Sequence, residues 1–242
     1  MHPAGASALL EVSIARKAYV AASGERIDVI RNVSFALRDG EVAAFVGPSG
    51  CGKTTMLRII AGIDTNFEGT IARPPGTLGM VFQEPRLLPW RTVDQNVRVV
   101  APEADDAKLA ALFALLELTA HRSHFPGELS LGLARRVALA RAFAVEPSLL
   151  ILDEPFASLD AALAARLRDE LAMLVDRNPV TTLLVTHDID EALRLADRLF
   201  VLSVRPTHIL ADIPIPGTRA ARSEADIASF KADISRHIQG TA

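Results

Sequence analysis

A glycine-rich loop between an apolar strand and an apolar helix constrains this chain more than any other feature. The loop is Gly47-Pro48-Ser49-Gly50-Cys51-Gly52-Lys53-Thr54, with the apolar run 42–46 before it and a predicted helix at 55–60 after it. This order is typical of a P-loop, in which glycines let successive backbone N–H groups face one phosphate and the helix start adds positive partial charge. A flexible glycine loop is the alternative, but the spacing and both flanking elements favour a nucleoside triphosphate site.

The last residues of the loop are expected to have separate roles. Lys53 is expected to reach the β- and γ-phosphates, and the hydroxyl of Thr54 is expected to bind Mg²⁺. All residues from Gly47 to Thr54, together with Thr55, are predicted to contact the nucleotide.

Composition limits the class of protein further. The 242 residues suffice for one large domain or two small ones, and half of them are hydrophobic. No apolar run approaches the roughly 20 residues of a membrane-spanning helix, and the first five residues do not resemble a signal peptide. The single cysteine excludes an internal disulfide framework and fits the cytosol, and a net charge of -3 does not indicate nucleic-acid binding.

Strand-like and helix-like patterns alternate along the chain. Strands are predicted at 11–15, 33–37, 42–46, 77–82, 149–152, 181–186, 199–203 and 209–212. Helices are predicted at 105–118, from Ser130 and from Asp160, and Asp188 is expected to cap a short helix with Glu191 as its reciprocal partner. The alternation predicts an α/β fold with a mainly parallel core sheet.

Two carboxylates follow the apolar strand 149–152. Asp153 and Glu154 lie where this strand leaves the sheet, and open α/β sheets bind ligands at that edge. Asp153 is expected to hold Mg²⁺ through its water shell, and Glu154 to polarise the attacking water. An acidic turn without chemistry is the alternative, which the P-loop upstream disfavours.

Two further polar residues also follow predicted strands. His187 comes after the strand 181–186, where a neutral imidazole can contact the γ-phosphate or orient the catalytic carboxylate. Gln83 comes after the strand 77–82, and its amide is expected to bind Mg²⁺ or to contact the attacking water. A structural histidine and an ordinary polar loop residue are the respective alternatives.

Ser130-Leu131-Gly132 lies at a predicted helix start. Ser130 is expected to be the N-cap, and a helix start with a serine and a glycine is also an anion site. The chain therefore has two predicted phosphate-binding helix starts. Both can act on one nucleotide if two copies of the chain face each other head to tail.

These motifs occur in the order found in ATP-binding cassette (ABC) transporter ATPases, and residues 11–213 resemble that family. The matching motifs are Gly47 to Thr54, Gln83, Leu129-Ser130-Leu131-Gly132-Leu133, Asp153-Glu154, Ser158-Leu159-Asp160 and His187. The resemblance implies a P-loop NTPase fold with an antiparallel β subdomain and a helical subdomain at about 84–147. On this interpretation residues 1–8 are a leader, 9–213 the ATPase domain and 214–242 a tail.

The resemblance also implies how nucleotide is bound. Two cassettes sandwich two ATP molecules, and each ATP contacts the P-loop of one chain and Ser130 and Gly132 of the other. Asp160 belongs to the loop that crosses the dimer interface, and Tyr19 resembles the aromatic residue that stacks on adenine. For Tyr19, a core or surface position is the alternative.

One position departs from the family signature. The signature usually has two consecutive glycines after the serine, but Leu131 replaces the first of them, and Leu133 replaces the final Gln or Met. Ser130 and Gly132 still offer a hydroxyl and an unobstructed backbone N–H. Hydrolysis is therefore expected to be retained but slowed, provided that the Leu131 side chain points away from the phosphate.

The segment 81–93 is similar to the importer ATPases of the nitrate, sulfonate and taurine group. Leu87, Leu88 and Trp90 form an apolar cluster between prolines, which is a candidate contact with a membrane subunit, with local packing as the alternative. The resemblance implies an ATP-hydrolysing importer subunit at the cytoplasmic face of the inner membrane, with a permease and a separate solute-binding protein as partners.

Two other function classes are less favoured. A soluble ABC ATPase acting on nucleic acid or ribosomes commonly has two cassettes or long coiled-coil insertions, and this chain has neither. A GTPase is disfavoured because no Asn-Lys-x-Asp motif is present, and a kinase because of Ser130-Leu131-Gly132 together with His187.

Overall fold

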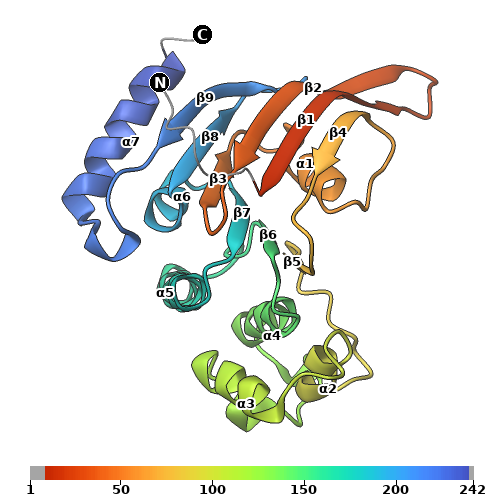
Figure 1. The fold of residues 1–242 in the computed structure, drawn as a ribbon, viewed down its shortest axis with the longest axis vertical. Coiled ribbons are helices and arrows are strands. Elements are labelled where there is room, and N and C mark those ends of the chain that lie inside the picture. The colour runs from red at the N-terminus through yellow and green to blue at the C-terminus, as the bar shows by residue number, and fades with distance from the viewer. Residues whose placement is uncertain (1–8, 240–242) are drawn as a thin grey trace. The chain divides into compact units, whose positions relative to one another are not determined.

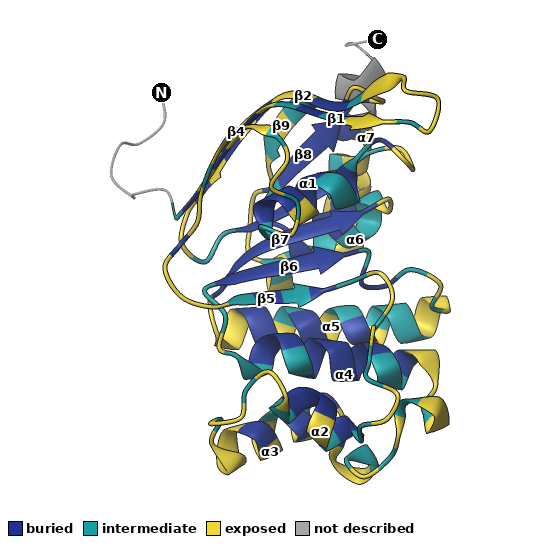
Figure 2. Cartoon of the chain, turned by 90° about the vertical axis from the view of Figure 1, so that its right-hand side faces the viewer, coloured by how far each residue is buried: buried dark blue, intermediate teal, exposed yellow. Residues whose placement is uncertain are grey.

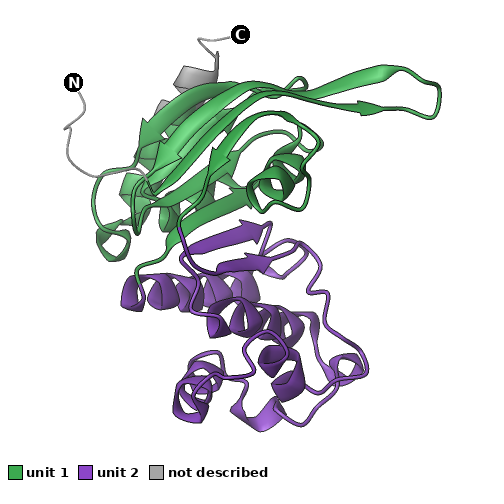
Figure 3. Ribbon diagram, turned by 45° about the vertical axis from the view of Figure 1, so that its right-hand side comes forward, with its two compact units in different colours: residues 1–74, 179–242 green, residues 75–178 purple. Residues whose placement is uncertain are grey.

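The computed structural model describes residues 9–239 and divides into two compact units (Figure 3). Unit 1 contains the residues up to Pro74 and those from Pro179 onward, and unit 2 contains the residues from Pro75 to Asn178. The predicted leader, 1–8, lies outside the described residues. No helix in the described range 9–239 is long and apolar enough to cross a membrane.

Four strands of unit 1 form a mostly parallel arrangement. Their order is β7 (Thr181–Thr186), β3 (Val42–Val46), β8 (Arg198–Leu202) and β9 (Ile209–Pro214). The strand β3 pairs in parallel with β7 and β8, and β9 pairs antiparallel with β8. Every residue of β3 is buried, as is every residue of β7 (Figure 2), which is typical of central strands covered on both faces.

The remaining strands of unit 1 form an antiparallel sheet in the order β2-β1-β4. These strands are β1 (Leu10–Val20), β2 (Arg26–Leu37) and β4 (Glu68–Ala72). The sequence predicted only 11–15 and 33–37 and missed β4. The structure extends β1 and β2 because each pairs with the other along its length, and their hairpin turns at Gly24, whose φ is +84°.

Three phenylalanines join the two sheets of unit 1. Phe45 of β3 stacks on Phe200 of β8 with ring centroids 4.9 Å apart. Phe35 of β2 lies 5.0 Å from Phe45 and 5.2 Å from Phe200, measured between centroids. Aromatic pairs at such distances add to the stabilisation from buried area, so this cluster fixes β3 against the antiparallel sheet.

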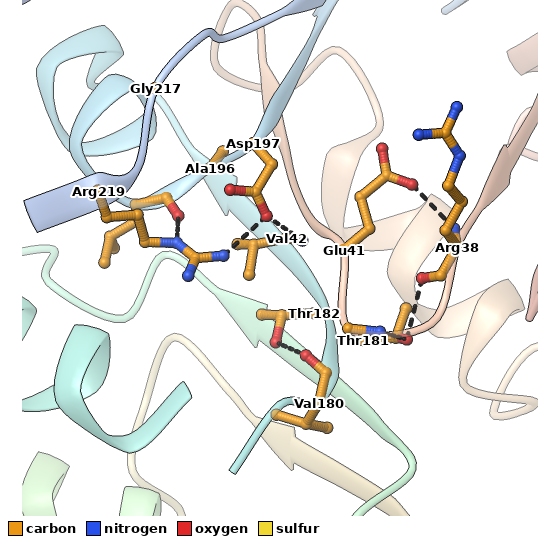
Figure 4. Close-up of polar contacts among 12 residues, drawn as sticks. Arg38, Glu41, Val42, Val180, Thr181, Thr182, Ala196, Asp197, Gly217 and Arg219 are labelled. Carbon is orange, nitrogen blue, oxygen red and sulfur yellow. Dashed lines mark hydrogen bonds and ion pairs between the residues drawn. The ribbon is translucent and has the colours of Figure 1, made fainter. Parts of the chain in front are cut away.

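Polar contacts hold the start of β3, as Figure 4 shows. The backbone N–H of Val42 donates to Asp197 Oδ2 (3.0 Å), and the same carboxylate oxygen accepts from Arg219 Nη2 (2.7 Å). In the preceding turn, the N–H of Gly40 donates to Thr181 Oγ1 (3.0 Å). The strand that leads into the P-loop is therefore anchored at its beginning.

The helices of unit 1 are α1 (Lys53–Ile60), α6 (Ile189–Leu195), α7 (Glu224–Gln239) and a 3-10 turn at Arg219–Ala221. The predicted tail, 214–242, contains the 16-residue helix α7. Ion pairs link α7 to α6: Lys231 lies 3.0 Å from Asp190, and Glu224 lies 2.5 Å from Arg194.

Unit 2 contains the parallel pair β5 (Leu78–Val81) and β6 (Leu149–Asp153). Every element between these strands is helical (Figure 1): α2 (Val93–Arg98), α3 (Asp106–Leu115), α4 (Leu131–Ala144) and 3-10 turns at Thr119–His121 and Pro126–Glu128. The helix α5 (Ala161–Arg177) follows β6. The predicted fold class, α/β with parallel strands, an antiparallel sheet and a helical region, is confirmed.

The helix α2, which the sequence did not predict, supports the segment that contains Trp90. Thr92 caps α2 in a capping box with Gln95. Asn96, fully buried, accepts from the N–H of Leu88 (2.7 Å) and donates to the carbonyls of Leu88 and Arg91 (3.1 and 3.0 Å). The amide thereby holds the turn that exposes Trp90.

We expect Asn96→Ala to destabilise the chain because it leaves several backbone groups of this turn without a partner. The loss is about 2–3 kcal/mol, which corresponds to a fall in Tm of roughly 5–10 °C for a protein of this size. Thermal unfolding followed by circular dichroism measures the change, with the exposed Glu103→Ala as the control. Equal Tm values for the two variants would show that Asn96 does not hold the turn.

Candidate nucleotide-binding site

The P-loop of unit 1 has the backbone geometry that its glycines predict. Gly50 and Gly52 have φ values of +76° and +128°, which non-glycine residues rarely adopt. A Cβ on Gly47 would lie 2.9 Å from Leu202 Cβ, so this position requires glycine for close approach. Cys51 is buried, with 2% of its surface exposed, and it therefore contributes to the loop through its backbone.

Lys53 is the first residue of α1 and is 95% buried, with a relative exposure of 5%. Its ammonium donates to the carbonyls of Gly47 (2.7 Å) and Pro48 (3.0 Å). The positive charge therefore lies inside the curve of the loop. Thr54 and Thr55 follow in the first turn of α1, where helix N–H groups lack intrahelical partners.

His187 follows β7 in unit 1 and is exposed. The neighbouring cap differs from the prediction. Asp188 caps α6 by accepting from the N–H of Asp190 (2.7 Å), but its own N–H donates to Thr186 Oγ1 (3.0 Å). The hydroxyl of Thr186 donates in turn to Glu191 (2.5 Å). The predicted direct pairing of Glu191 with Asp188 is thus relayed through a threonine, which fixes the backbone beside His187.

Tyr19 lies near the end of β1 and is 42% exposed. Its hydroxyl donates to Asp64 Oδ2 (3.1 Å), and Lys17 Nζ lies 4.6 Å from the ring centroid. Lys17 also pairs with Asp64 Oδ1 at 2.8 Å. One face of the ring is thus covered by a cation, and the ring is held by the same carboxylate that holds the lysine.

The pKa of Asp64 reflects these contacts. Partial burial raises it, but hydrogen bonds from Lys17, the N–H of Asn66 and Tyr19 outweigh that effect and lower the pKa below its ordinary value. Asp64 therefore stabilises the fold at pH values above the ordinary pKa of an aspartate. This stabilisation is lost as the pH falls through the lowered pKa.

Asp153 and Glu154 end β6 in unit 2. Asp153 is buried and is the last residue of the strand, whereas Glu154 is partly exposed and has a φ of +46°. A non-glycine residue with such a φ is uncommon and requires support from its surroundings. Part of that support comes from the helix α4.

Arg135 of α4 holds the backbone that follows Glu154. Its guanidinium, 4% exposed, donates to the carbonyls of Glu154 (3.3 Å), Pro155 (2.8 Å) and Ala157. An arginine that donates to three carbonyls of one turn fixes the direction of that turn. The sequence patterns did not reveal Arg135, because its contacts lie about 20 residues away along the chain.

Ser130 is the N-cap of α4, as predicted, and accepts from the N–H of Leu133 (3.3 Å). Leu131 is 43% exposed, so it is not part of the core of unit 2. Gly132 is buried, and a Cβ on it would lie 2.6 Å from Leu163 Cδ2 of α5. Gly132 thus allows α4 and α5 to approach closely.

Two predicted residues of unit 2 lie on exposed loops or helix ends. Gln83 follows β5 and is exposed. Asp160 is exposed and caps α5 by accepting from the N–H of Leu163 (3.0 Å).

The predicted site residues lie at strand ends in both units. Unit 1 brings together the P-loop and His187 at the ends of its parallel strands β3 and β7. Unit 2 has Gln83, Asp153 and Glu154 at the ends of its parallel strands β5 and β6.

We expect Arg135→Gln to slow nucleotide hydrolysis about tenfold or more while the KM for ATP changes little. Glu154 is predicted to polarise the attacking water, and displacing a group with that role costs rate before it costs binding. Steady-state phosphate release measures both constants. Arg177→Gln, at the exposed end of α5, is the matched control. An unchanged kcat with a raised KM would assign Arg135 to binding instead.

Comparison with known proteins places the chain in one family. The ABC transporter family matches residues 30–157. The aliphatic sulfonates import ATP-binding protein SsuB 2 of Pseudomonas syringae pv. tomato is 40% identical over 93% of this chain and 95% of the relative. The aliphatic sulfonates import ATP-binding protein SsuB of Bacillus cereus is 37% identical over 82% of this chain and 84% of the relative.

A solved structure shares the fold. It is a dimeric ATP-binding cassette in a post-hydrolysis state bound to ADP and Pi, with a TM-score of 0.76 and 27% identity over 86% of this chain and all of that chain. The P-loop geometry of unit 1, the capped helix α4 of unit 2 and these similarities lead to one conclusion. The chain belongs to the ABC transporter family, as an ATP-binding subunit.

Proposed function

We propose that this chain is the ATP-hydrolysing subunit of an importer for nitrate, sulfonates, taurine or a similar small solute. The observation that carries the proposal is about 40% identity, over nearly the whole chain, to relatives named as aliphatic sulfonate import ATP-binding proteins. These names do not favour the alternative of an ATPase that acts on nucleic acid or ribosomes.

In the proposed site, the P-loop from Gly47 to Thr55 binds the phosphates of ATP. Lys53 turns its ammonium from the loop carbonyls toward the β- and γ-phosphates, and the N–H groups of the loop donate to the same oxygens. The free face of the Tyr19 ring stacks on adenine, while Lys17 covers the opposite face. His187 contacts the γ-phosphate from the end of β7.

The proposed site also suits Mg²⁺. The hydroxyl of Thr54, the carboxylate of Asp153 and the amide oxygen of Gln83 are the oxygen donors that this ion prefers. When bound, the ion neutralises charge on the phosphates. Asp153 is buried at the end of β6, and buried carboxylates in proteins are commonly paired with a cation or bind a metal ion.

Glu154 is the proposed general base. It accepts a proton from the attacking water as the water oxygen bonds to the γ-phosphorus, and the bond from that phosphorus to the β–γ bridging oxygen breaks. ADP leaves with the electron pair, and inorganic phosphate is the second product. The positive φ of Glu154 and the hold of Arg135 on the following carbonyls support a fixed direction for this carboxylate.

Two copies of the chain are proposed to complete each site. Ser130 and Gly132 of one copy donate to the γ-phosphate that the P-loop of the other copy holds, and Asp160 lies in the loop at their interface. The exposure of Ser130 and Asp160 supports this assignment, since both are accessible to a second copy. Leu131 is exposed beside them, and its bulk is expected to slow rather than abolish hydrolysis.

The proposed partners are an integral membrane permease and a separate solute-binding protein, with the chain at the cytoplasmic face of the inner membrane. Trp90, which is 70% exposed between the partly buried Leu88 and the capped helix α2, is the proposed anchor in the permease contact. The family of the chain supports a permease partner, because its named relatives are import subunits.

We expect Glu154→Gln to bind ATP with near-wild-type affinity but to lose at least about 100-fold in hydrolysis rate, because the amide cannot accept the proton. ATP is then expected to hold two copies together. Size-exclusion chromatography with light scattering and ATP measures the dimer, with Asp169→Asn on the exposed surface of α5 as the control. Normal turnover by the Glu154 variant would remove this residue from the role of base.

We expect the chain to co-purify from bacterial membranes with an integral membrane protein, and Trp90→Ala to reduce that recovery several-fold. Trp90 is the only tryptophan, so the substitution changes one exposed aromatic contact. Val20→Ala, at a residue that is 71% exposed, serves as the control. Recovery of ribosomes or DNA in place of a membrane protein would overturn the importer assignment.

A further inference from the structure

The connection between β8 and β9 runs along the P-loop of unit 1. Leu202, at the end of β8, lies where a side chain on Gly47 would be, with 2.9 Å between the two Cβ positions. Thr207 Oγ1 lies 3.1 Å from the Cβ position of Gly52. The P-loop therefore packs against the segment 202–207 at its beginning, where Gly47 contacts Leu202, and near its end, where Gly52 contacts Thr207.

Hydrogen bonds fix this connection at both ends. Thr207 is fully buried, and its hydroxyl donates to the carbonyl of Cys51 within the P-loop. Its N–H donates to the carbonyl of Val29 (2.8 Å), and its carbonyl accepts from the N–H of Arg31 (2.9 Å). The N–H of Ser203 donates to the carbonyl of His208 (3.0 Å), which closes the connection into a tight loop.

Arg205 lies at the tip of this loop, between its two fixed ends. Its side chain is exposed, and Nη2 lies 3.9 Å from the Cβ position of Gly50 in the P-loop. Among the side chains that the structure describes, no hydrogen bond or ion pair to this guanidinium is found. An unpaired cation is thus held in van der Waals range of the loop that is built to receive a polyanion.

We propose that Arg205 is a second phosphate-binding cation of this site and contacts the phosphates of bound nucleotide from the β8–β9 connection. The proposal rests on nucleotide binding by the P-loop. A nucleoside triphosphate carries several negative charges close together, and Lys53 supplies a single ammonium to them. The planar guanidinium of arginine can donate two parallel hydrogen bonds to phosphate oxygens. Because the Arg205 guanidinium is unpaired, no acidic partner has to be displaced before it binds phosphate.

The structure separates this role from that of the neighbouring residues. Thr207 holds the P-loop backbone through a neutral hydroxyl, so it contributes to the conformation of the loop and adds no charge. Arg205 makes no contact of this kind and is exposed, so removing its charge leaves the packing of the connection on Gly47 and Gly52 intact. A loss of affinity in a charge-neutral variant therefore reports a contact with the ligand.

The test is ATP binding by the full chain, measured through displacement of a fluorescent ATP analogue and through stopped-flow dissociation. We expect Arg205→Gln to weaken ATP binding about tenfold or more, mainly by faster dissociation, because a charge-assisted hydrogen bond is lost. Arg205→Lys is expected to recover part of the affinity. Arg38→Gln is the control, since Arg38 lies before the start of β3 and uses its backbone in the contacts of Figure 4.

The outcomes distinguish this proposal from the nucleotide site itself. If Lys53→Ala abolishes ATP binding while Arg205→Gln stays within twofold of the wild type, the P-loop assignment stands and the role of Arg205 is refuted. A slower association rate with an unchanged dissociation rate also refutes it, because that pattern indicates long-range attraction only. If the wild type itself does not bind ATP, the proposed function fails first. Thermal unfolding of each variant confirms that the fold is retained.

Discussion

The close packing of the P-loop backbone against the β8–β9 connection is the constraint on which the structure of unit 1 depends. Glycine at positions 47 and 52 lets Leu202 and Thr207 approach within about van der Waals contact, and the Thr207 hydroxyl binds a carbonyl of the loop itself. At its other end, β3 is tied through Val42 to Asp197, which also binds Arg219. The strand and loop are thus fixed at both ends, so the N–H groups of the loop are already oriented for phosphate before it binds. Preorganised donors of this kind bind an anion without paying for reorganisation.

Unit 2 relies on a different constraint, the buried charges of α4. Arg136 is 6% exposed and pairs with Glu170 of α5 at 2.6 Å and with Glu117 at 2.5 Å. Burial raises the pKa of Glu170 although Arg136 opposes that shift, so the pair is held at a cost in desolvation. The pair links α4 to α5. The adjacent Arg135 holds the turn after Glu154, and Ser130 caps the same helix. The geometry of the helix start and that of the carboxylate therefore share one support.

Local sequence patterns predicted the features that depend on neighbouring residues. The P-loop with its flanking strand and helix and the cap at Ser130 all follow from spacing within about ten residues. The patterns did not reveal β4 or α2. They also gave no sign of Arg135 or Thr207. These last two act through partners at separations of 20 and 156 residues, which no periodicity encodes. The relay through Thr186 was also missed. The capping-box pattern pairs Glu191 directly with the backbone N–H of Asp188, whereas in the structure this N–H donates to the Thr186 hydroxyl, which donates to Glu191.

The central claim is that one copy of this chain binds the phosphates of ATP through its P-loop while a second copy supplies the start of α4. A structure of the chain determined with ATP and magnesium tests this most directly. We predict that Ser130 Oγ of one copy lies within hydrogen-bond distance of the γ-phosphate whose oxygens contact Lys53 of the other copy. A nucleotide bound at Lys53 with Ser130 remote from it in every pairing of copies would contradict the account.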